Sequence, residues 1–325
     1  MQPGLLTTLT HRAMATEFVV MLPATDAAAA DLALGTLEML DEIEAKLTIY
    51  QPESEISQVN RDASDRPVIV SAETFSILKR AVHWSQQTSG AFDITAGPLV
   101  QAWGFTKRTG RKPSASEIQA ARKCVGYQYL ILNESDNSVA FAVPGMSINL
   151  GGIGKGYALD QLANQLTSQG VKNFLLHGGQ SSVIARGDQS PGVEQLGWAV
   201  GISHPTKPQQ RLAGIWLRDA ALGTSGSGKQ FFHHQGRRYG HVIDPRTGNP
   251  SGDLLSLTVL TASAADADAS ATGYFVAGRQ VATQLFDSES AASKELSMVL
   301  VKPGRRQDSA ELESFGEFAW VDEAN

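Results

Sequence analysis

Residues 147–160 constrain the fold more than any other part of the sequence, because four of six consecutive residues at this corner are glycines: Gly151, Gly152, Gly154 and Gly156. Apolar residues before the glycines predict a short strand, and apolar spacing after them predicts a helix that ends at Gly170. Glycine lets a backbone approach a ligand closely, and the free N–H groups at a helix start favour an anion. Lys155 adds a positive charge to this corner.

The glycine corner does not match the two common phosphate-binding motifs. A P-loop requires Ser or Thr directly after its Gly-Lys pair, and here Gly156 follows Lys155. A dinucleotide fingerprint requires a third glycine at the place where Tyr157 stands. The corner is therefore a strand, glycine loop and helix of another kind, and two interpretations stay open: a phosphate site or a plain tight turn.

Length and charge narrow the classes of protein. A chain of 325 residues is expected to form a single domain over residues 1–325, or two intimately packed lobes. A net charge of −6 without a basic stripe argues against a nucleic-acid surface. The sequence contains no run of about 18 apolar residues, so no transmembrane segment is expected.

The compartment stays open at this stage. The first residues lack the charged and apolar regions of a signal peptide. We therefore expect a cytoplasmic protein if the chain is complete, and a periplasmic or membrane-anchored one if a leader was removed.

Hydrophobic periodicity predicts helices and strands that do not alternate strictly, which favours an α+β fold with mixed β-sheets and flanking helices. Helices are expected at residues 26–47, 71–89, 114–124, 157–170 and 264–276. Strands are expected at residues 8–22, 173–177, 198–202, 212–217, 255–260 and 297–301, with a hairpin around residues 133–137. Residues 50–60, 178–182 and 223–228 have the composition of turns and loops.

An acid and a hydroxyl, Asp93 and Thr95, lie two residues apart after Ala91 and Phe92. With aromatic residues on either side, they would suit the exposed rim of a ligand site. Asp93 would suit an Asx-type cap for a short following helix equally well. The sequence leaves both interpretations open.

His241 stands between a short predicted strand and an Asp-Pro-x-Thr-Gly turn at residues 244–248. A histidine beside a turn can act as a general base near neutral pH. The alternative is a histidine that only hydrogen-bonds the turn. His233 and His234, in a polar segment, are expected to be solvated.

Asp268 and Thr272 lie four residues apart on an alanine-rich predicted helix, so both side chains leave the same face. A carboxylate and a hydroxyl backed by small side chains suit a hard cation of the magnesium type. The alternative is an acid that favours the helix dipole and a threonine bonded back to its own helix. Together, a metal, an anion-binding corner and a histidine indicate chemistry on a phosphate ester or pyrophosphate.

Taken in order, these stretches resemble the ApbE family of flavin transferases (FAD:protein FMN transferases). Seven motifs carry the resemblance: AMAT at residues 13–16, the polar stretch at 50–60, GAFDIT at 90–95, LGGIGKGYA at 150–158, TSG at 224–226, HVIDPRTG at 241–248 and ADASAT at 267–272. The resemblance implies a T-fold-like architecture. It also implies transfer of FMN from FAD to a threonine hydroxyl of an acceptor flavoprotein, assisted by Mg²⁺, with release of AMP.

The resemblance also assigns roles by family position. Asp268, Thr272 and the main-chain carbonyl of Gly152 would bind the metal, and His241 would be the base. The FAD site would be lined by Met14, Tyr50, Ala91, Phe92, Asp93, Asn149, Lys155 and Val242.

Three positions depart from the family pattern, and one of them, Gly154 in place of a commoner Ala, is expected to be harmless. Asn149 stands where the family often has Asp, and Ala271 stands where some members place a second acidic residue, so fewer carboxylates would hold the metal. Two rival functions keep the same site. One is an FAD pyrophosphatase that uses water as acceptor and releases FMN and AMP, and the other is a non-catalytic FAD-binding protein.

Overall fold

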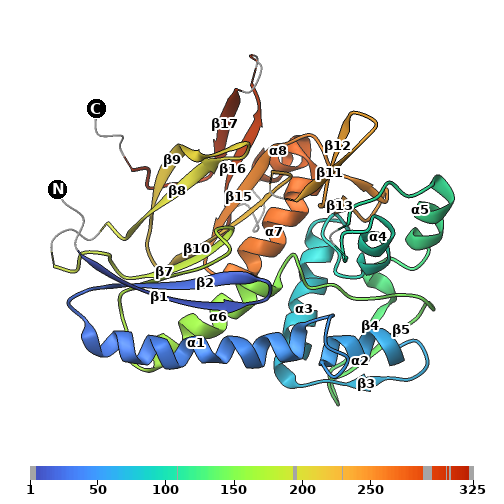
Figure 1. Cartoon of the computed structure of the whole chain (residues 1–325), viewed down its shortest axis with the longest axis horizontal. Coiled ribbons are helices and arrows are strands. Elements are labelled where there is room, and N and C mark those ends of the chain that lie inside the picture. Colours follow the sequence, from blue (N-terminus) through green and yellow to red (C-terminus); the bar gives the residue numbers. More distant parts are fainter. Residues whose placement is uncertain are drawn as a thin grey trace.

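An eight-stranded sheet forms the centre of the protein (Figure 1). The computed structural model describes residues 5–107, 109–192, 196–228, 230–287, 295–304, 306 and 309–321. From edge to edge, the sheet contains β1 (Leu6–Ala13), β2 (Thr16–Pro23), β6 (Phe174–Gly178), β7 (Ser182–Arg186), β10 (Ala220–Gly226), β15 (Ser256–Thr261), β16 (Ser297–Pro303) and β17 (Ala310–Phe315). The expected α+β class is confirmed. Within the described residues, neighbouring strands of this sheet pair antiparallel, where mixed sheets were expected.

The two faces of this sheet are covered differently, because successive side chains of a strand point to opposite faces. Phe174 and Leu176 of β6 contact the core shared with three helices, α1 (Ala27–Leu47), α6 (Gly154–Ser168) and α7 (Ala264–Ala277). Leu175, between them, belongs to the core on the opposite face. There the sheet is covered by a two-stranded ribbon of β8 (Trp198–His204) and β9 (Lys207–Leu217).

Two smaller groups of elements extend the molecule beyond the sheet (Figure 1). The first shares a core with α7 and contains α2 (Glu55–Asp62), α3 (Ala72–Gln87), β3 (Val68–Ile69), β4 (Leu130–Asn133) and β5 (Ser138–Phe141). The second surrounds Trp103 and contains α4 (Gly97–Ala102), α5 (Ala115–Arg122), β11 (Phe231–His234), β12 (Arg237–Gly240), β13 (Ile243–Asp244) and β14 (Asn249–Pro250). The remaining short helices are η1 (Tyr127–Tyr129) and α8 (Arg279–Asp287). None of the helices in the described ranges is long and apolar enough to cross a membrane.

Helix α7 is buried on nearly all sides, and two glycines bring neighbouring elements against its backbone. A Cβ added to Gly156 of α6 would lie 2.0 Å from the carbonyl oxygen of Ala264. A Cβ added to Gly223 of β10 would lie 2.3 Å from the carbonyl carbon of Ala267. Both distances are far inside van der Waals contact, so only glycine fits. These close approaches fix α7 beside the glycine corner.

Replacing Gly156 by alanine is expected to destabilise the protein by about 3 kcal/mol, because the added methyl group overpacks a rigid backbone contact. Gly35, on the exposed side of α1, is the matched control, since a Cβ there meets nothing within 4 Å. Gly35→Ala should stabilise the protein by about 0.5–1 kcal/mol through the higher helix propensity of alanine. Denaturant unfolding of both variants measures the difference. Equal stability of the two would contradict the proposed packing.

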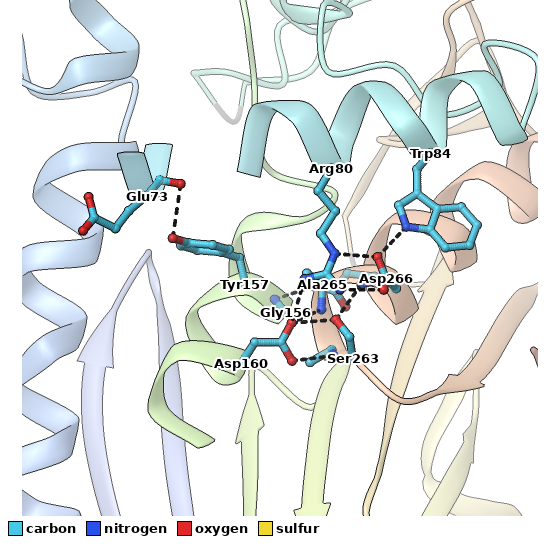
Figure 2. A network of polar contacts seen from close by, with 11 residues as sticks. Glu73, Arg80, Trp84, Gly156, Tyr157, Asp160, Ser263, Ala265 and Asp266 are labelled. Carbon is cyan, nitrogen blue, oxygen red and sulfur yellow. Dashed lines mark hydrogen bonds and ion pairs between the residues drawn. The ribbon is translucent and has the colours of Figure 1, made fainter. Parts of the chain in front are cut away.

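A carboxylate on α6 caps the start of α7 (Figure 2). Asp160 accepts hydrogen bonds from the Ser263 hydroxyl at 2.6 Å and from the N–H groups of Ala264 at 2.8 Å and Ala265 at 3.1 Å. The first N–H groups of a helix have no partner within the helix, so this capping satisfies donors that burial would otherwise penalise. It also joins α6 to α7.

A second carboxylate joins α7 to α3 (Figure 2). Asp266 accepts two hydrogen bonds from the Arg80 guanidinium, at 2.7 and 2.6 Å, and one from the Trp84 indole N–H at 2.6 Å. Paired, charge-assisted bonds of this kind fix orientation as well as adding energy. Helix α7, which carries Asp268, is thereby held from two sides.

Several elements predicted from the sequence are confirmed. The predicted helices α1 and α5 are present: Asp26 caps α1, and Ser114 and Glu117 form a capping box at the start of α5. The predicted helices over α3, α6 and α7 are present, as is the hairpin of β4 and β5. Gly170, directly after α6, adopts a left-handed φ of 87°, and Gly278 caps α7 with a φ of 85°.

Other expectations were wrong. Residues 8–22 form two strands instead of one, because Met14 and Ala15 both adopt left-handed φ angles, 51° and 57°, and turn the chain into a hairpin. Residues 50–60 contain helix α2, capped by Ser54. Residues 147–150 have no named strand and form only an isolated bridge from Ser147 to Ala96. Residues 223–228 were expected to be a loop, but most of them belong to the central strand β10. Their side chains are small because α7 lies so close to the sheet that large ones would not fit.

Candidate active site

One large cleft contains every site residue that the family resemblance assigns, whereas Thr95 is buried outside it and so does not form an exposed rim. The volume of the cleft is about 1030 Å³. The β1–β2 turn, the loops before and after α4, the start of α6, strand β10, the β12–β13 segment and α7 all contribute to its walls. The expected residues that line it are Met14, Tyr50, Ala91, Phe92, Asp93, Asn149, Gly152, Lys155, His241, Val242, Asp268 and Thr272. Segments far apart in the sequence therefore meet at one place, although this placement alone does not assign their roles.

Asp268 lies at the base of this cleft with its side chain buried. Its carboxylate accepts bonds from the Ser182 hydroxyl, at 2.7 and 2.9 Å, and from the Gly156 N–H at 2.8 Å. The Lys155 ammonium lies 3.9 Å away. Burial raises the pKa of Asp268, whereas Lys155 and the hydrogen bonds from Ser182 and Gly156 act in the opposite direction by favouring the carboxylate. A cation bound beside it would favour the carboxylate further.

Thr272 follows Asp268 by one helical turn and is half-buried. Its hydroxyl donates to the Asp268 carbonyl at 3.0 Å and lies 2.8 Å from the Ser225 hydroxyl of β10. The threonine is therefore bonded back to its helix, as one of the two interpretations expected. Its oxygen still has a lone pair for a further partner. A Cβ added to Gly152 would lie 3.5 Å from this hydroxyl, so the glycine corner adjoins it.

The donors at this point of the cleft fit a hard cation. Asp268, Thr272, Ser225 and the Gly152 main chain all offer oxygen, the ligand type that Mg²⁺ prefers. Within the described part of the chain, no cluster of three or more His, Cys, Asp or Glu side chains could hold a metal. Any ion here would depend on one carboxylate, with hydroxyl and carbonyl oxygens, substrate oxygens or water completing its shell.

His241 lies in the wall of the cleft, between β12 and β13. Its Nδ1 lies 3.1 Å from the Gln230 carbonyl oxygen, which can only accept, so Nδ1 carries the proton. The neutral ring then has an unprotonated Nε2, as a general base requires. Burial lowers the pKa of His241, and the Lys155 charge lowers it further, while the bond to Gln230 opposes them. The neutral form therefore predominates at pH 7.

Asp93 and Asn149 organise the main chain around the cleft. The Asp93 carboxylate accepts bonds from the Thr95 N–H at 2.8 Å, the Thr95 hydroxyl at 2.7 Å and the Tyr127 N–H at 2.8 Å. This is the Asx-type arrangement, although Asp93 also lines the cleft. Burial raises its pKa, and these hydrogen bonds oppose the shift. The Asn149 side-chain oxygen accepts from the Gly151 N–H at 2.8 Å and so shapes the glycine corner.

Apolar side chains form another part of the cleft wall. Met14 reaches it from a strained left-handed turn, a conformation that often marks a functional site. Ala91 and Phe92 are buried, whereas Tyr50 is 68% exposed and donates to the Thr106 carbonyl at 3.3 Å. Rings and a thioether at such a place suit a flat heterocycle.

Sequence reasoning missed three groups that act on the expected residues. Ser182 holds the Asp268 carboxylate, Ser225 contacts the Thr272 hydroxyl, and the Gln230 carbonyl fixes the His241 tautomer. Ser182 and Ser225 lie on paired strands that the sequence presented as loops. The carbonyl is a main-chain group, which no residue type could have identified.

The fold defines the class of protein to which the chain belongs. A solved flavin transferase ApbE from Vibrio cholerae matches it with a TM-score of 0.80 and 28% identity, over 96% of this chain and 98% of that one. The ApbE protein of Thermotoga maritima matches with a TM-score of 0.84 and 29% identity, over 95% and 96% of the two chains. The architecture is therefore that of the flavin transferases.

The sequence gives the family. The ApbE family profile matches residues 14–294. An FAD:protein FMN transferase of Vibrio cholerae serotype O1 is 34% identical over 246 residues, which cover 74% of this chain and 72% of that protein. One from Escherichia coli K12 is 32% identical, over 88% and 83%. The chain belongs to the ApbE family.

Proposed function

We propose that this chain is an FAD:protein FMN transferase that uses Mg²⁺ and a threonine-bearing acceptor protein. The observation that carries the proposal is the meeting of His241, Lys155 and the oxygen cluster around Asp268 in one cleft of about 1030 Å³. That volume is at the upper end of the roughly 300–1,000 Å³ usual for small-molecule sites, so a dinucleotide could be accommodated. The names of the related transferases support the same reaction.

The reaction needs one bond formed and one broken. The acceptor threonine oxygen attacks the FMN phosphorus of FAD, the diphosphate linkage breaks, and AMP leaves with the bridging oxygen. Nε2 of His241 would take the hydroxyl proton. Lys155 would contact a phosphate oxygen, and Met14 and Tyr50 would pack against a ring of the substrate.

The metal would be held by the Asp268 carboxylate, the Thr272 hydroxyl and the Gly152 carbonyl. When bound, Mg²⁺ would supply charge neutralisation to the diphosphate oxygens. Asp268 needs no reorganisation for this role, because Ser182 and the Gly156 N–H already fix its carboxylate.

Purified protein, FAD and Mg²⁺ distinguish the transferase from its rivals. We expect AMP and an acceptor whose mass has increased by that of FMN, with little AMP when no acceptor is present. AMP released at the same rate without an acceptor would identify an FAD pyrophosphatase. Tight FAD binding without AMP under any condition would identify a non-catalytic FAD-binding protein.

The transfer rate should depend on pH through His241. Because burial lowers its pKa, the base stays neutral below 6.5, the ordinary imidazole value, and is lost only as the pH falls through the lowered pKa. We expect kcat to be flat above 6.5 and to decline at more acidic pH. A pH–rate profile at saturating FAD and acceptor measures this. An acidic midpoint above 6.5 would contradict the assignment.

A further inference from the structure

The hairpin of β11 and β12 projects from the body of the molecule (Figure 1), and two of its residues, Phe231 and Arg238, line the cleft. Its strand pairing places Phe232 opposite Tyr239 and His233 opposite Arg238. The Phe232 and Tyr239 rings stack at 5.3 Å, and Trp103 lies 5.5 Å from Tyr239. These contacts seat the hairpin on the core around Trp103, so the side chains it carries are held in place.

Three cations lie on or beside this hairpin: Arg237 and Arg238 belong to β12, and Lys112 lies next to it. Arg237 lies 5.4 Å and the Lys112 ammonium 5.9 Å from the centre of the Tyr239 ring. The Arg238 guanidinium lies 3.9 Å from the centre of the Phe231 ring and donates to the Ser227 carbonyl. Cations over aromatic faces keep most of their charge available to a further partner.

None of these three cations forms an ion pair with a carboxylate of the described residues. Other arginines nearby in the sequence do form ion pairs: Arg111, next to Lys112, with Glu117, and Arg246, further along the chain, with Asp244. The three cations thus gather at one place on a chain whose net charge is −6. Unpaired cations at a surface attract an acidic partner.

An apolar contact accompanies the charge. Phe231 is 41% exposed, and both Phe231 and Arg238 line the cleft. The hairpin thus joins the cleft, where the chemistry would occur, to the outer surface that carries Lys112 and Arg237. A protein bound to this surface could therefore reach into the cleft, whose wall also contains His241.

We propose that the β11–β12 hairpin, with Lys112 beside it, docks an acidic segment of the acceptor protein next to the threonine that enters the cleft. This inference rests on the proposed transferase function for the identity of the partner. The cations would hold the acidic side chains, and Phe231 would contact an apolar side chain of the same segment.

Fluorescence anisotropy with two labelled peptides tests this docking without any turnover. One peptide has aspartates around a threonine and a leucine, and its copy has asparagines instead. At low ionic strength the acidic peptide should bind to the wild-type protein and its copy should not. K112E/R237E should weaken acidic-peptide binding about tenfold, and K112Q/R237Q by less, since it removes charge without reversing it. FAD affinity should not change, because neither residue lines the cleft.

Lys172→Glu is the matched control, since Lys172 is exposed, forms no ion pair with a described carboxylate and lies outside the cleft. Its binding of the acidic peptide should equal that of the wild type. Equal binding of the two peptides, an equal loss in Lys172→Glu, or retained binding by K112E/R237E would overturn the proposal. With an identified acceptor, K112E/R237E should raise KM and leave kcat unchanged. If no acceptor is ever modified although peptide binding responds as expected, the transferase function fails and the docking surface stands.

Discussion

Replacing Asp268 by alanine is expected to abolish Mg²⁺-dependent release of AMP from FAD in the presence of an acceptor protein. Asp268 is the one carboxylate assigned to the proposed site, so the substitution removes the charged ligand of the ion. Without the ion, the negative charge of the diphosphate oxygens stays unneutralised. AMP formation over a range of Mg²⁺ concentrations measures the effect. Asp268→Asn, which keeps the shape and removes the charge, should lose activity almost as completely.

Asp266→Ala is the control for Asp268→Ala, because Asp266 lies on the same helix and contacts Arg80 and Trp84 outside the cleft. It should lower stability by about 1–3 kcal/mol, since Arg80 keeps only its 3.7 Å ion pair with Asp160 and the Trp84 N–H loses its acceptor, and it should leave kcat unchanged. Wild-type turnover by Asp268→Ala would show that the metal assignment is wrong. Equal losses of activity in both variants would show that Asp268 acts only through stability.

Replacing His241 by asparagine is expected to slow transfer about 100-fold or more, the usual scale for the loss of a general base. FAD should still bind, because Lys155 and the apolar wall around Met14 and Phe92 are untouched. Single-turnover rates and FAD titration separate the two effects. His83→Asn, an exposed histidine on α3 outside the cleft, is the control and should have the wild-type rate. An unchanged rate in His241→Asn would leave His241 with a purely structural role.

Much of the fold could be predicted because local signals agreed with the packing. Asp26 before α1 and Ser114 with Glu117 before α5 are caps that depend only on neighbouring residues. Strand β10 could not be predicted in this way. Its glycines and small side chains have low strand propensity, and they are required because α7 lies against the strand. The Met14–Ala15 turn was missed because neither residue favours the left-handed conformation it adopts.

The site was predictable in outline for a different reason. His241, Asp268 and the glycine corner each had two interpretations in the sequence. Together they indicated chemistry on a phosphate, and the resemblance to a family assigned each of them a specific role. The structure places them around one cleft, and it also shows why single residues were ambiguous. Asp93 both closes an Asx-type turn and lines the cleft, and Thr272 is bonded back to its helix beside the proposed metal ligands.

The partners of these residues lay beyond any sequence pattern. Ser182 meets Asp268 across 86 residues of chain, through the packing of α7 on β7 and β10. The contact that fixes the His241 tautomer uses a main-chain carbonyl. Such contacts follow from tertiary structure, since no local spacing specifies them.

Anomalous diffraction from a crystal soaked with Mn²⁺ and FAD tests the central claim most directly, because Mn²⁺ accepts the same oxygen ligands as Mg²⁺. We expect one ion in contact with an Asp268 carboxylate oxygen, the Thr272 hydroxyl and the Gly152 carbonyl, with the diphosphate of FAD against it and His241 facing the FMN phosphorus. An ion bound elsewhere, with FAD in the cleft and Asp268 still bonded only to Ser182 and the Gly156 N–H, would contradict the account.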